Sequence, residues 1–281
     1  MNIWIAGARP KTLPAAVAPV LVGTSLAHNS FNLTAALLAL TVSLALQIGV
    51  NFANDYSDGI RGTDEVRVGP LRITASGLAS PSAVKGAAYL AFLIAACAGL
   101  ALAFISSWWL IAIGASAIVA AWKYTGGKNP YGYNGLGEIF VFIYFGLVAT
   151  VGTYYVQTEE ITFIAFLAAV PIGLLACLIL AVNNIRDRVH DQTAGKRTSA
   201  VRLGDKGSRL MATSFLVLAH LVTITISFHA FIATLLLAPL SFSIARGLLK
   251  GTSGSELIIY IARTGKLHLA FSVALSLGIL F

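Results

Sequence analysis

Charged residues are scarce in this chain. Asp, Glu, Lys and Arg together make up 11% of its 281 residues, whereas about 25% is usual for a soluble domain. Hydrophobic residues account for 57%. This composition excludes an ordinary water-soluble fold and predicts an integral membrane protein.

Cysteine is almost absent. The two cysteines, Cys97 and Cys177, each lie within an apolar run, where cysteine packs as a small hydrophobic residue. Two cysteines in such places give no support for a disulfide framework or for a cysteine-based metal site.

Several long runs contain no charge. A hydrocarbon core about 30 Å thick needs roughly 17 to 25 apolar residues per helix. Runs near that length fall at residues 12–28, 33–53, 83–106, 108–122, 136–156, 161–184, 210–228, 230–245 and 265–281. They predict an all-α integral membrane protein with about nine transmembrane helices, in a single domain over residues 1–281. The count is least secure at 108–122, 230–245 and 265–281, because these runs are short and Pro239 interrupts the second of them.

Lys and Arg are missing from every second connection between these runs. The connections around Asn29, Ser106, Glu159 and Phe228 contain none, so all 19 basic residues lie in the N-terminal segment or in the remaining connections. Because basic loops stay in the cytoplasm, the pattern predicts a cytoplasmic N-terminus. The net charge of +8 then reflects topology and argues against nucleic-acid binding. We expect a multi-pass protein of a bacterial inner (cytoplasmic) membrane, with its first apolar run retained.

Seven of the eleven acidic residues gather in two connections on the predicted cytoplasmic side: Asp55, Asp58, Asp64, Glu65, Asp187, Asp191 and Asp205. Helical spacing places Asn51, Asp55 and Asp58 on one helix face, and Asn184, Asp187 and Asp191 on another. Carboxylates this close to each other and to a bilayer need a compensating cation. Oxygen ligands suit Mg2+, which is usually held by one or two carboxylates together with substrate phosphates.

Basic residues follow both acidic clusters: Arg61, Arg67 and Arg72 after the first, and Arg186, Lys196, Arg197 and Arg202 after the second. A third connection on the same side, W-K-Y-T-G-G-K-N-P-Y-G-Y-N-G-L-G-E, contributes Tyr124 and Lys128. Arginine binds phosphate oxygens in pairs, and lysine acts as a point charge. Each cation alone is also explained by the charge bias of cytoplasmic loops. Acids, metal and cations together indicate a diphosphate held between two helix ends.

These motifs resemble those of the UbiA superfamily of intramembrane prenyltransferases. The first motif is N-D-Y-S-D at residues 54–58, preceded by Asn51. The second is D-R-V-H-D at residues 187–191, and the Y-x-x-x-K element runs from Tyr124 to Lys128. The resemblance extends from residue 8 to about residue 270. It includes A-R-P-K-T-L-P-A, G-P-L-R-I-T-A-S-G, P-Y-G-Y-N-G-L-G-E and A-G-K-R-T-S-A-V-R-L-G.

The resemblance implies nine helices around a central cavity, with a metal and diphosphate site under the cytoplasmic loops and a lateral opening for a prenyl tail. It implies Mg2+ as cofactor, held by Asn51, Asp55, Asp58, Asp187 and Asp191, of which the four aspartates are catalytic. The diphosphate would contact Lys11, Arg61, Arg72, Tyr124, Lys128, Lys196 and Arg197. Many superfamily members space the acids of the first motif four apart, whereas Asp55 and Asp58 are three apart. Whether Asp58 or Asp64 binds the metal is therefore left open.

The flanking stretches resemble superfamily members that prenylate 1,4-dihydroxy-2-naphthoate. The implied reaction transfers a polyprenyl group from polyprenyl diphosphate to this ring, with loss of CO2 and diphosphate, to give demethylmenaquinone. Transfer to 4-hydroxybenzoate, homogentisate or haem remains an alternative, as do a CDP-alcohol phosphotransferase and a membrane transporter. Aromatic side chains able to shield an allylic cation follow the glycine-rich connection: Phe140, Phe142, Tyr144, Phe145, Tyr154 and Tyr155. The sequence predicts neither prenyl length nor oligomeric state.

Overall fold

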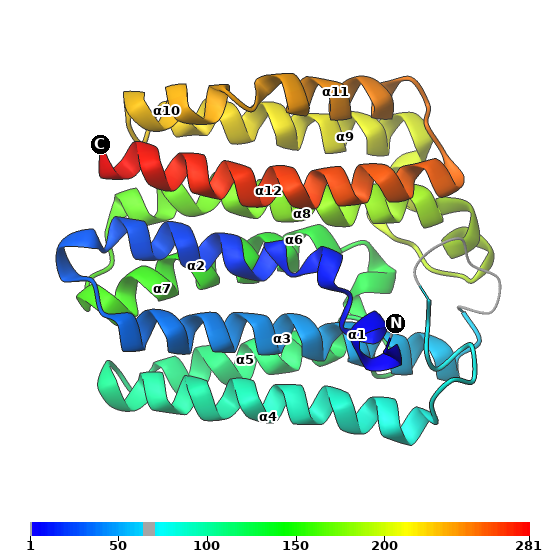
Figure 1. Ribbon diagram of the computed structural model, residues 1–281. Coiled ribbons are helices and arrows are strands. Elements are labelled where there is room, and N and C mark those ends of the chain that lie inside the picture. The colour runs from blue at the N-terminus through cyan, green and yellow to red at the C-terminus, as the bar shows by residue number, and fades with distance from the viewer. Residues whose placement is uncertain (1, 64–70) are drawn as a thin grey trace.

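The protein is a bundle of helices (Figure 1). A computed structural model describes residues 2–63 and 71–281, and this part of the chain contains no strand. Its α-helices are α1 (Ile3–Ala8), α2 (Pro14–Leu26), α3 (Leu33–Ile60), α4 (Pro81–Ile105), α5 (Leu110–Lys123), α6 (Gly137–Val141), α7 (Ala149–Thr158), α8 (Phe163–Thr193), α9 (Ser199–Thr223), α10 (Phe228–Leu235), α11 (Ala238–Leu249) and α12 (Leu257–Leu280). Asp64, Glu65 and Arg67, which the sequence singled out, lie outside the described residues.

Short helical segments of other types join these helices. The 3-10 turns are η1 (Pro10–Thr12), η2 (His28–Ser30), η3 (Tyr131–Asn134) and η5 (Gly254–Glu256). A π-helical segment, η4 (Phe142–Val148), connects α6 to α7 without a break. Helix α9 is interrupted at Gly204, where φ is +71°, a backbone conformation that favours glycine.

Local sequence explains where several helices begin. The side chains of Asn32, Ser80 and Ser227 each accept a hydrogen bond from a backbone N–H in the first turn of α3, α4 and α10, which is the usual role of an N-cap. Pro14 and Pro81 occupy the starts of α2 and α4, where the missing N–H has no helical partner to lose. Each predicted apolar run coincides with one helix or with consecutive helical segments.

Several helices are suited to crossing a bilayer. Among the described residues, five helices are long and apolar enough, and α10 with α11 makes a sixth candidate if the pair, bent by 57°, is one span. Helices α2 and α5 are apolar but shorter. The prediction of an all-α, multi-pass membrane protein is thereby confirmed. Nine crossings and a cytoplasmic N-terminus stay predictions.

Close contacts between small residues bring the central helices together. Helix α3 packs against α4, α8 against α9, and α12 against α2. Where η4 meets α8, a Cβ added to Gly146 would lie 2.6 Å from the Cα of Gly173. Membrane helices commonly approach each other through such small residues. This contact fixes the segment 142–148 against the long helix that carries the second acidic motif.

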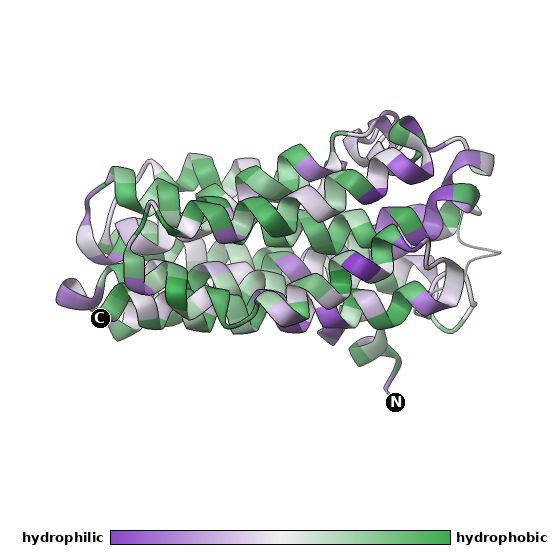
Figure 2. Ribbon diagram, turned by 90° about the horizontal axis from the view of Figure 1, so that it is seen from above, coloured by the Kyte–Doolittle hydropathy of each residue, from purple (hydrophilic) through white to green (hydrophobic). Residues whose placement is uncertain are grey.

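One end of the bundle is rich in hydrophilic residues. Helices α3 and α8 both end at the right-hand side of Figure 1, and the loops after α5 and α8 lie at that end, as do the described residues that follow α3, 61–63 and 71–80. Figure 2 shows hydrophilic residues gathered there, whereas the middle of the bundle is mainly hydrophobic. The two acidic motifs therefore lie at the same end of the molecule.

Candidate active site

A cavity of about 940 Å³ opens between α2, α3, α5, η4, α7 and α8. At one end it is polar, and its wall there includes Asn51, Asn54, Asp58, Arg72, Asn184, Asp187, Asp191 and Lys196. Elsewhere the wall is largely apolar, with side chains such as Leu110, Ile113, Val148 and Phe166. The cavity can therefore hold a molecule with a charged head and a hydrocarbon tail.

One face of α3 supplies the polar wall on one side. Ser43, Gln47, Asn51, Asn54 and Asp58 all line the cavity, and they recur every three or four residues as one helix face requires. Sequence reasoning began this face at Asn51 and missed Ser43 and Gln47. Both residues could have been predicted by continuing the same spacing two turns towards the N-terminus.

Asp58 lies at the centre of a group of donors. The Tyr133 hydroxyl donates to Asp58 Oδ1 at 2.6 Å. Lys196 Nζ is 3.3 Å from the same oxygen, and Arg72 is 3.7 Å from Oδ2. Burial raises the pKa of the Tyr133 hydroxyl above its usual value, and the nearby Asp58 carboxylate raises it further. Tyr133 therefore stays a neutral donor, and the two cations stabilise the charge of a carboxylate that is only 3% exposed.

Asp55, unlike Asp58, does not contribute its side chain to the described cavity wall. It is fully buried and is not among the described residues that line the cavity. Its Oδ2 accepts the backbone N–H of Ile73 at 3.0 Å and its Oδ1 accepts that of Thr74 at 2.8 Å. The carboxylate thus fastens the segment that follows Arg72 to the end of α3. The predicted metal contact of Asp55 stays a prediction.

The second motif lies on the opposite wall. Asn184, Asp187 and Asp191 all line the cavity from α8. Arg186 binds the Asp187 carboxylate through two hydrogen bonds of 2.7 Å, a fork geometry that suits a carboxylate. After α8 ends, the chain turns so that the Lys196 N–H donates to the Asp191 carbonyl at 2.8 Å. This turn brings the Lys196 side chain into the cavity.

Glu138 is a buried acid that sequence reasoning did not select. Its Oε1 accepts a hydrogen bond from Asn184 Nδ2 at 3.0 Å and another from the Ser199 hydroxyl. Glu138 is 9% exposed and stands at the start of α6, after the glycine-rich connection. It joins α6 to α8 and α9 and holds the amide of Asn184 at the cavity wall.

The predicted diphosphate contacts separate into two groups. Lys11, Arg72, Tyr124 and Lys196 line the cavity. Arg61, Lys128 and Arg197 are not among the described lining residues, and all three are exposed. Arg61 donates to the carbonyls of Thr125 and Gly127, so it braces the connection that carries Lys128. Substrate contacts by these three residues stay predictions.

The donor set at the polar end consists of oxygens. In the described part of the chain, no three His, Cys, Asp or Glu side chains lie close enough to hold a metal ion among themselves. Carboxylates from α3 and α8 nevertheless face one space, together with the side-chain amides of Asn51, Asn54 and Asn184. Such donors fit Mg2+, which keeps water and substrate phosphate among its ligands.

Aromatic rings line the cavity next to the polar end. Tyr124 packs against Tyr131, whose ring stacks on that of Phe140 with centroids 3.9 Å apart. Tyr144 continues the series at 6.3 Å from Phe140. Of the six aromatic residues considered from the sequence, the four that line the cavity are Phe140, Tyr144, Phe145 and Tyr155.

Comparisons with known proteins show what this chain is similar to. A family described as the UbiA prenyltransferase family matches residues 16–260. A Mycobacterium tuberculosis protein named 1,4-dihydroxy-2-naphthoate octaprenyltransferase is 45% identical, over 99% of this chain and 97% of its own. A Haemophilus influenzae protein of the same name is 38% identical, over 100% and 96%. A solved structure of a UbiA homologue from Archaeoglobus fulgidus, bound to GPP and Mg2+, has a TM-score of 0.68 at 13% identity, covering 97% of this chain and 98% of that one.

Proposed function

Because this chain belongs to the UbiA prenyltransferase family, we propose that it transfers a polyprenyl group from polyprenyl diphosphate to 1,4-dihydroxy-2-naphthoate. The products are the quinol form of demethylmenaquinone, CO2 and diphosphate. The names of the Mycobacterium and Haemophilus relatives support the choice of acceptor. The observation that carries the proposal is a single cavity that joins facing acidic and basic residues to an apolar interior.

The polar end suits the diphosphate. Arg72 and Lys196 are less than 10% exposed and line the cavity beside Asp58. Negative charge builds up on the diphosphate as its bond to the prenyl carbon breaks. Cations that are already in place, in a space with little water, stabilise that charge strongly. We assign Arg72, Lys196 and Lys11 to this task, with the Tyr124 hydroxyl as a further donor.

Mg2+ is the proposed cofactor, and the A. fulgidus homologue bound to GPP and Mg2+ supports it. In this chain the residues that would hold the ion are Asp58, Asp187 and Asp191, with the amide oxygen of Asn51. Mg2+ would neutralise charge on the diphosphate oxygens. We assign Asp55 to holding the segment 72–74, because it is fully buried, is not among the described residues that line the cavity, and accepts two backbone N–H groups from that segment.

The reaction at the aromatic ring does not require a side chain of the protein to act as a base. The C–O bond between the prenyl group and the diphosphate breaks and leaves an allylic cation. The ring carbon that bears the carboxylate attacks this cation, and the C–C bond to the carboxylate then breaks to release CO2. The electron pair of that bond returns to the ring, so no ring proton has to be removed. The rings of Phe140 and Tyr144 beside this space would favour the cation through their faces.

The same proposal includes the topology. We propose nine crossings, with α2 and α5 as short spans, α10 and α11 as one bent span, and α9 as another. With the N-terminus in the cytoplasm, the polar end of the cavity faces the cytoplasmic side of the membrane. The basic residues of the sequence support this orientation because they are confined to the N-terminal segment and alternate connections.

The decisive test is turnover by the purified protein in lipid vesicles. A polyprenyl diphosphate is supplied with 1,4-dihydroxy-2-naphthoate or with 4-hydroxybenzoate, and product, CO2 and diphosphate are measured. We expect a prenylated naphthoquinol, with CO2 and diphosphate released in equal amounts. Prenylation of 4-hydroxybenzoate alone would keep the reaction class and overturn the acceptor. Absence of diphosphate release with either acceptor would contradict the proposal.

A further inference from the structure

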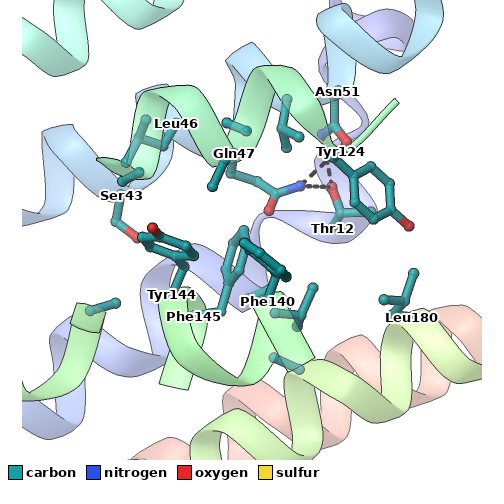
Figure 3. A pocket seen from close by; sticks show the side chains of 18 of the residues that line it. Thr12, Ser43, Leu46, Gln47, Asn51, Tyr124, Phe140, Tyr144, Phe145 and Leu180 are labelled. Atoms are coloured by element: carbon teal, nitrogen blue, oxygen red, sulfur yellow. Dashed lines mark hydrogen bonds between the residues drawn. The ribbon is translucent and has the colours of Figure 1, made fainter. Parts of the chain in front are cut away.

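Gln47 stands at the boundary between the polar and the apolar parts of the cavity. It is 6% exposed and lies one turn before Asn51 on the cavity face of α3. Its Nε2 donates to Thr12 Oγ1 at 3.0 Å and to Asn51 Oδ1 at 3.3 Å, as Figure 3 shows. The bond to Thr12 joins α3 to the turn η1.

The surrounding hydrogen bonds fix which end of the Gln47 amide faces the cavity. The Ala8 carbonyl accepts only, so the amide nitrogen of Asn51 must face it, at 2.9 Å. Asn51 Oδ1 is then the atom that faces Gln47, and Gln47 must offer its nitrogen. Thr12 Oγ1 donates to the Arg9 carbonyl at 2.9 Å and accepts from both amides. Among the described residues, no hydrogen-bond donor pairs with Gln47 Oε1.

We infer that Gln47 Oε1 accepts a hydrogen bond from a hydroxyl group of the aromatic acceptor and thereby orients its ring. The inference rests on the proposed function and adds the residue that recognises the acceptor. Figure 3 shows the rings of Phe140, Tyr144 and Phe145 facing Gln47 across the drawn space, and all three line the same cavity. A flat hydroxylated ring between them would meet aromatic faces on one side and an amide oxygen on the other.

The chemistry of the amide selects the hydroxyl rather than the carboxylate of the acceptor. A carboxylate and an amide oxygen are both hydrogen-bond acceptors, so they would repel each other, whereas a phenolic hydroxyl donates. Gln47 precedes Asp58 by about three helical turns, roughly 16 Å along α3. A ring held at Gln47 therefore lies beyond the diphosphate, on the side where the prenyl carbon chain leaves it. The carboxylate end of the ring can then point towards the site of bond formation.

A purely structural glutamine is the alternative, and the chain contains a matched example. Gln157 is 9% exposed. Its Nε2 donates to Thr24 Oγ1 and to the Thr153 carbonyl, and its Oε1 accepts the Asn32 N–H. Gln157 is not among the described residues that line the cavity. Both of its amide ends are used within the protein, which distinguishes it from Gln47.

The test compares Gln47→Met with Gln157→Met in lipid vesicles. Both changes replace a buried amide side chain with an apolar side chain of similar volume. We expect Gln47→Met to raise the KM for 1,4-dihydroxy-2-naphthoate about tenfold, as the loss of one hydrogen bond predicts. The KM for polyprenyl diphosphate should change far less, because Gln47 is connected to the proposed metal site only through Asn51. Gln157→Met should leave both KM values unchanged. If Gln47→Met folds poorly, Gln47→Asn replaces it in the test. This change withdraws the amide by one methylene group and should also weaken binding of the aromatic acceptor.

Two analogues identify the hydrogen bond itself. As competitive inhibitors, 1-hydroxy-2-naphthoate and 4-hydroxy-2-naphthoate each lack one hydroxyl group. We expect one of them to bind the wild type about tenfold more weakly than 1,4-dihydroxy-2-naphthoate, and this difference to vanish in Gln47→Met. A difference that persists in the variant, or equal binding of all three rings to the wild type, would overturn the inference and leave the proposed function standing. If neither the wild type nor Gln157→Met prenylates this acceptor, the proposed function fails, and this role of Gln47 fails with it.

Discussion

The fully buried side chain of Asp55 binds the backbone of Ile73: the Asp55 carboxylate oxygen Oδ2 accepts the Ile73 N–H at 3.0 Å. The neighbouring Oδ1 binds the next N–H, that of Thr74. Both bonds join the end of α3 to the segment that carries Arg72, and Arg72 lines the cavity beside Asp58. An acid of the first motif thus positions a cation that we assign to the diphosphate.

Asp55→Asn should release this segment. The new amide would turn an N–H group towards a backbone N–H, and leaving a buried donor unpaired costs about 1–3 kcal/mol. We expect kcat/KM for polyprenyl diphosphate to fall at least tenfold, and trypsin to cleave after Arg72, which is 9% exposed in the intact protein. Asp58→Asn is the control, since it should lose activity while Arg72 stays protected. If Arg72 is also protected in Asp55→Asn, Asp55 acts at the metal rather than through the segment.

Lys196 and Lys128 provide a second test, because the sequence predicted both as diphosphate contacts. Lys196 is 8% exposed and lines the cavity, whereas Lys128 is exposed on the connection after α5. A hydrogen bond to a charged group contributes about 1.5–3 kcal/mol. We therefore expect Lys196→Met to raise the KM for polyprenyl diphosphate at least tenfold, and Lys128→Met to raise it far less. Equal effects in steady-state kinetics would show that Lys128 reaches the diphosphate after all.

The sequence predicted which residues gather at the site better than it predicted which of their side chains face the cavity. Asn51, Asp55 and Asp58 were predicted to share one face of α3. The cavity-lining residues Ser43, Gln47, Asn51, Asn54 and Asp58 define a face whose centre is about 80° from Asp55 around the helix, at 100° per residue. A spacing of four residues therefore left the direction of Asp55 open. Only the position of the neighbouring segment 72–74 settles it.

Hydropathy located the helices better than it located their ends. The apolar runs at 33–53 and 161–184 continue as helix to Ile60 and Thr193, because a helix does not stop where its side chains become polar. The π-helical segment at Phe142–Val148 had no signal in the apolar pattern. It lies where Gly146 meets Gly173, a contact between residues far apart in the chain that no local pattern reports.

Removal of metal should stop the reaction. Carboxylates on α3 and α8 face one cavity, and a hard cation would bridge them to the diphosphate. We expect EDTA to abolish diphosphate release and excess Mg2+ to restore it. Ca2+ should restore it poorly, because Ca2+ prefers longer bonds and more ligands. Asp187→Asn should raise the Mg2+ concentration needed for half-maximal activity. Full turnover in EDTA would remove the metal from the proposal.

The contact between η4 and α8 should be sensitive to a single methyl group. A Cβ at Gly146 would lie 2.6 Å from Gly173 Cα and 3.3 Å from the Ala169 carbonyl oxygen. These are backbone atoms, so the helices must move apart. Overpacking of this kind costs about 1–3 kcal/mol, and we expect Gly146→Ala to lower the thermal unfolding temperature in detergent. Activity should fall as well, because Tyr144 and Phe145 line the cavity from the same segment.

Gly86→Ala is the matched control, because a Cβ there would meet nothing within 4 Å. Gly86 lies within α4, where alanine is favoured over glycine by about 0.5–1 kcal/mol. We therefore expect its unfolding temperature to stay the same or to rise slightly, with normal turnover. Equal unfolding temperatures for the two variants would mean that η4 and α8 can separate without loss. In that case the aromatic wall opposite Gln47 would not depend on the contact between Gly146 and Gly173.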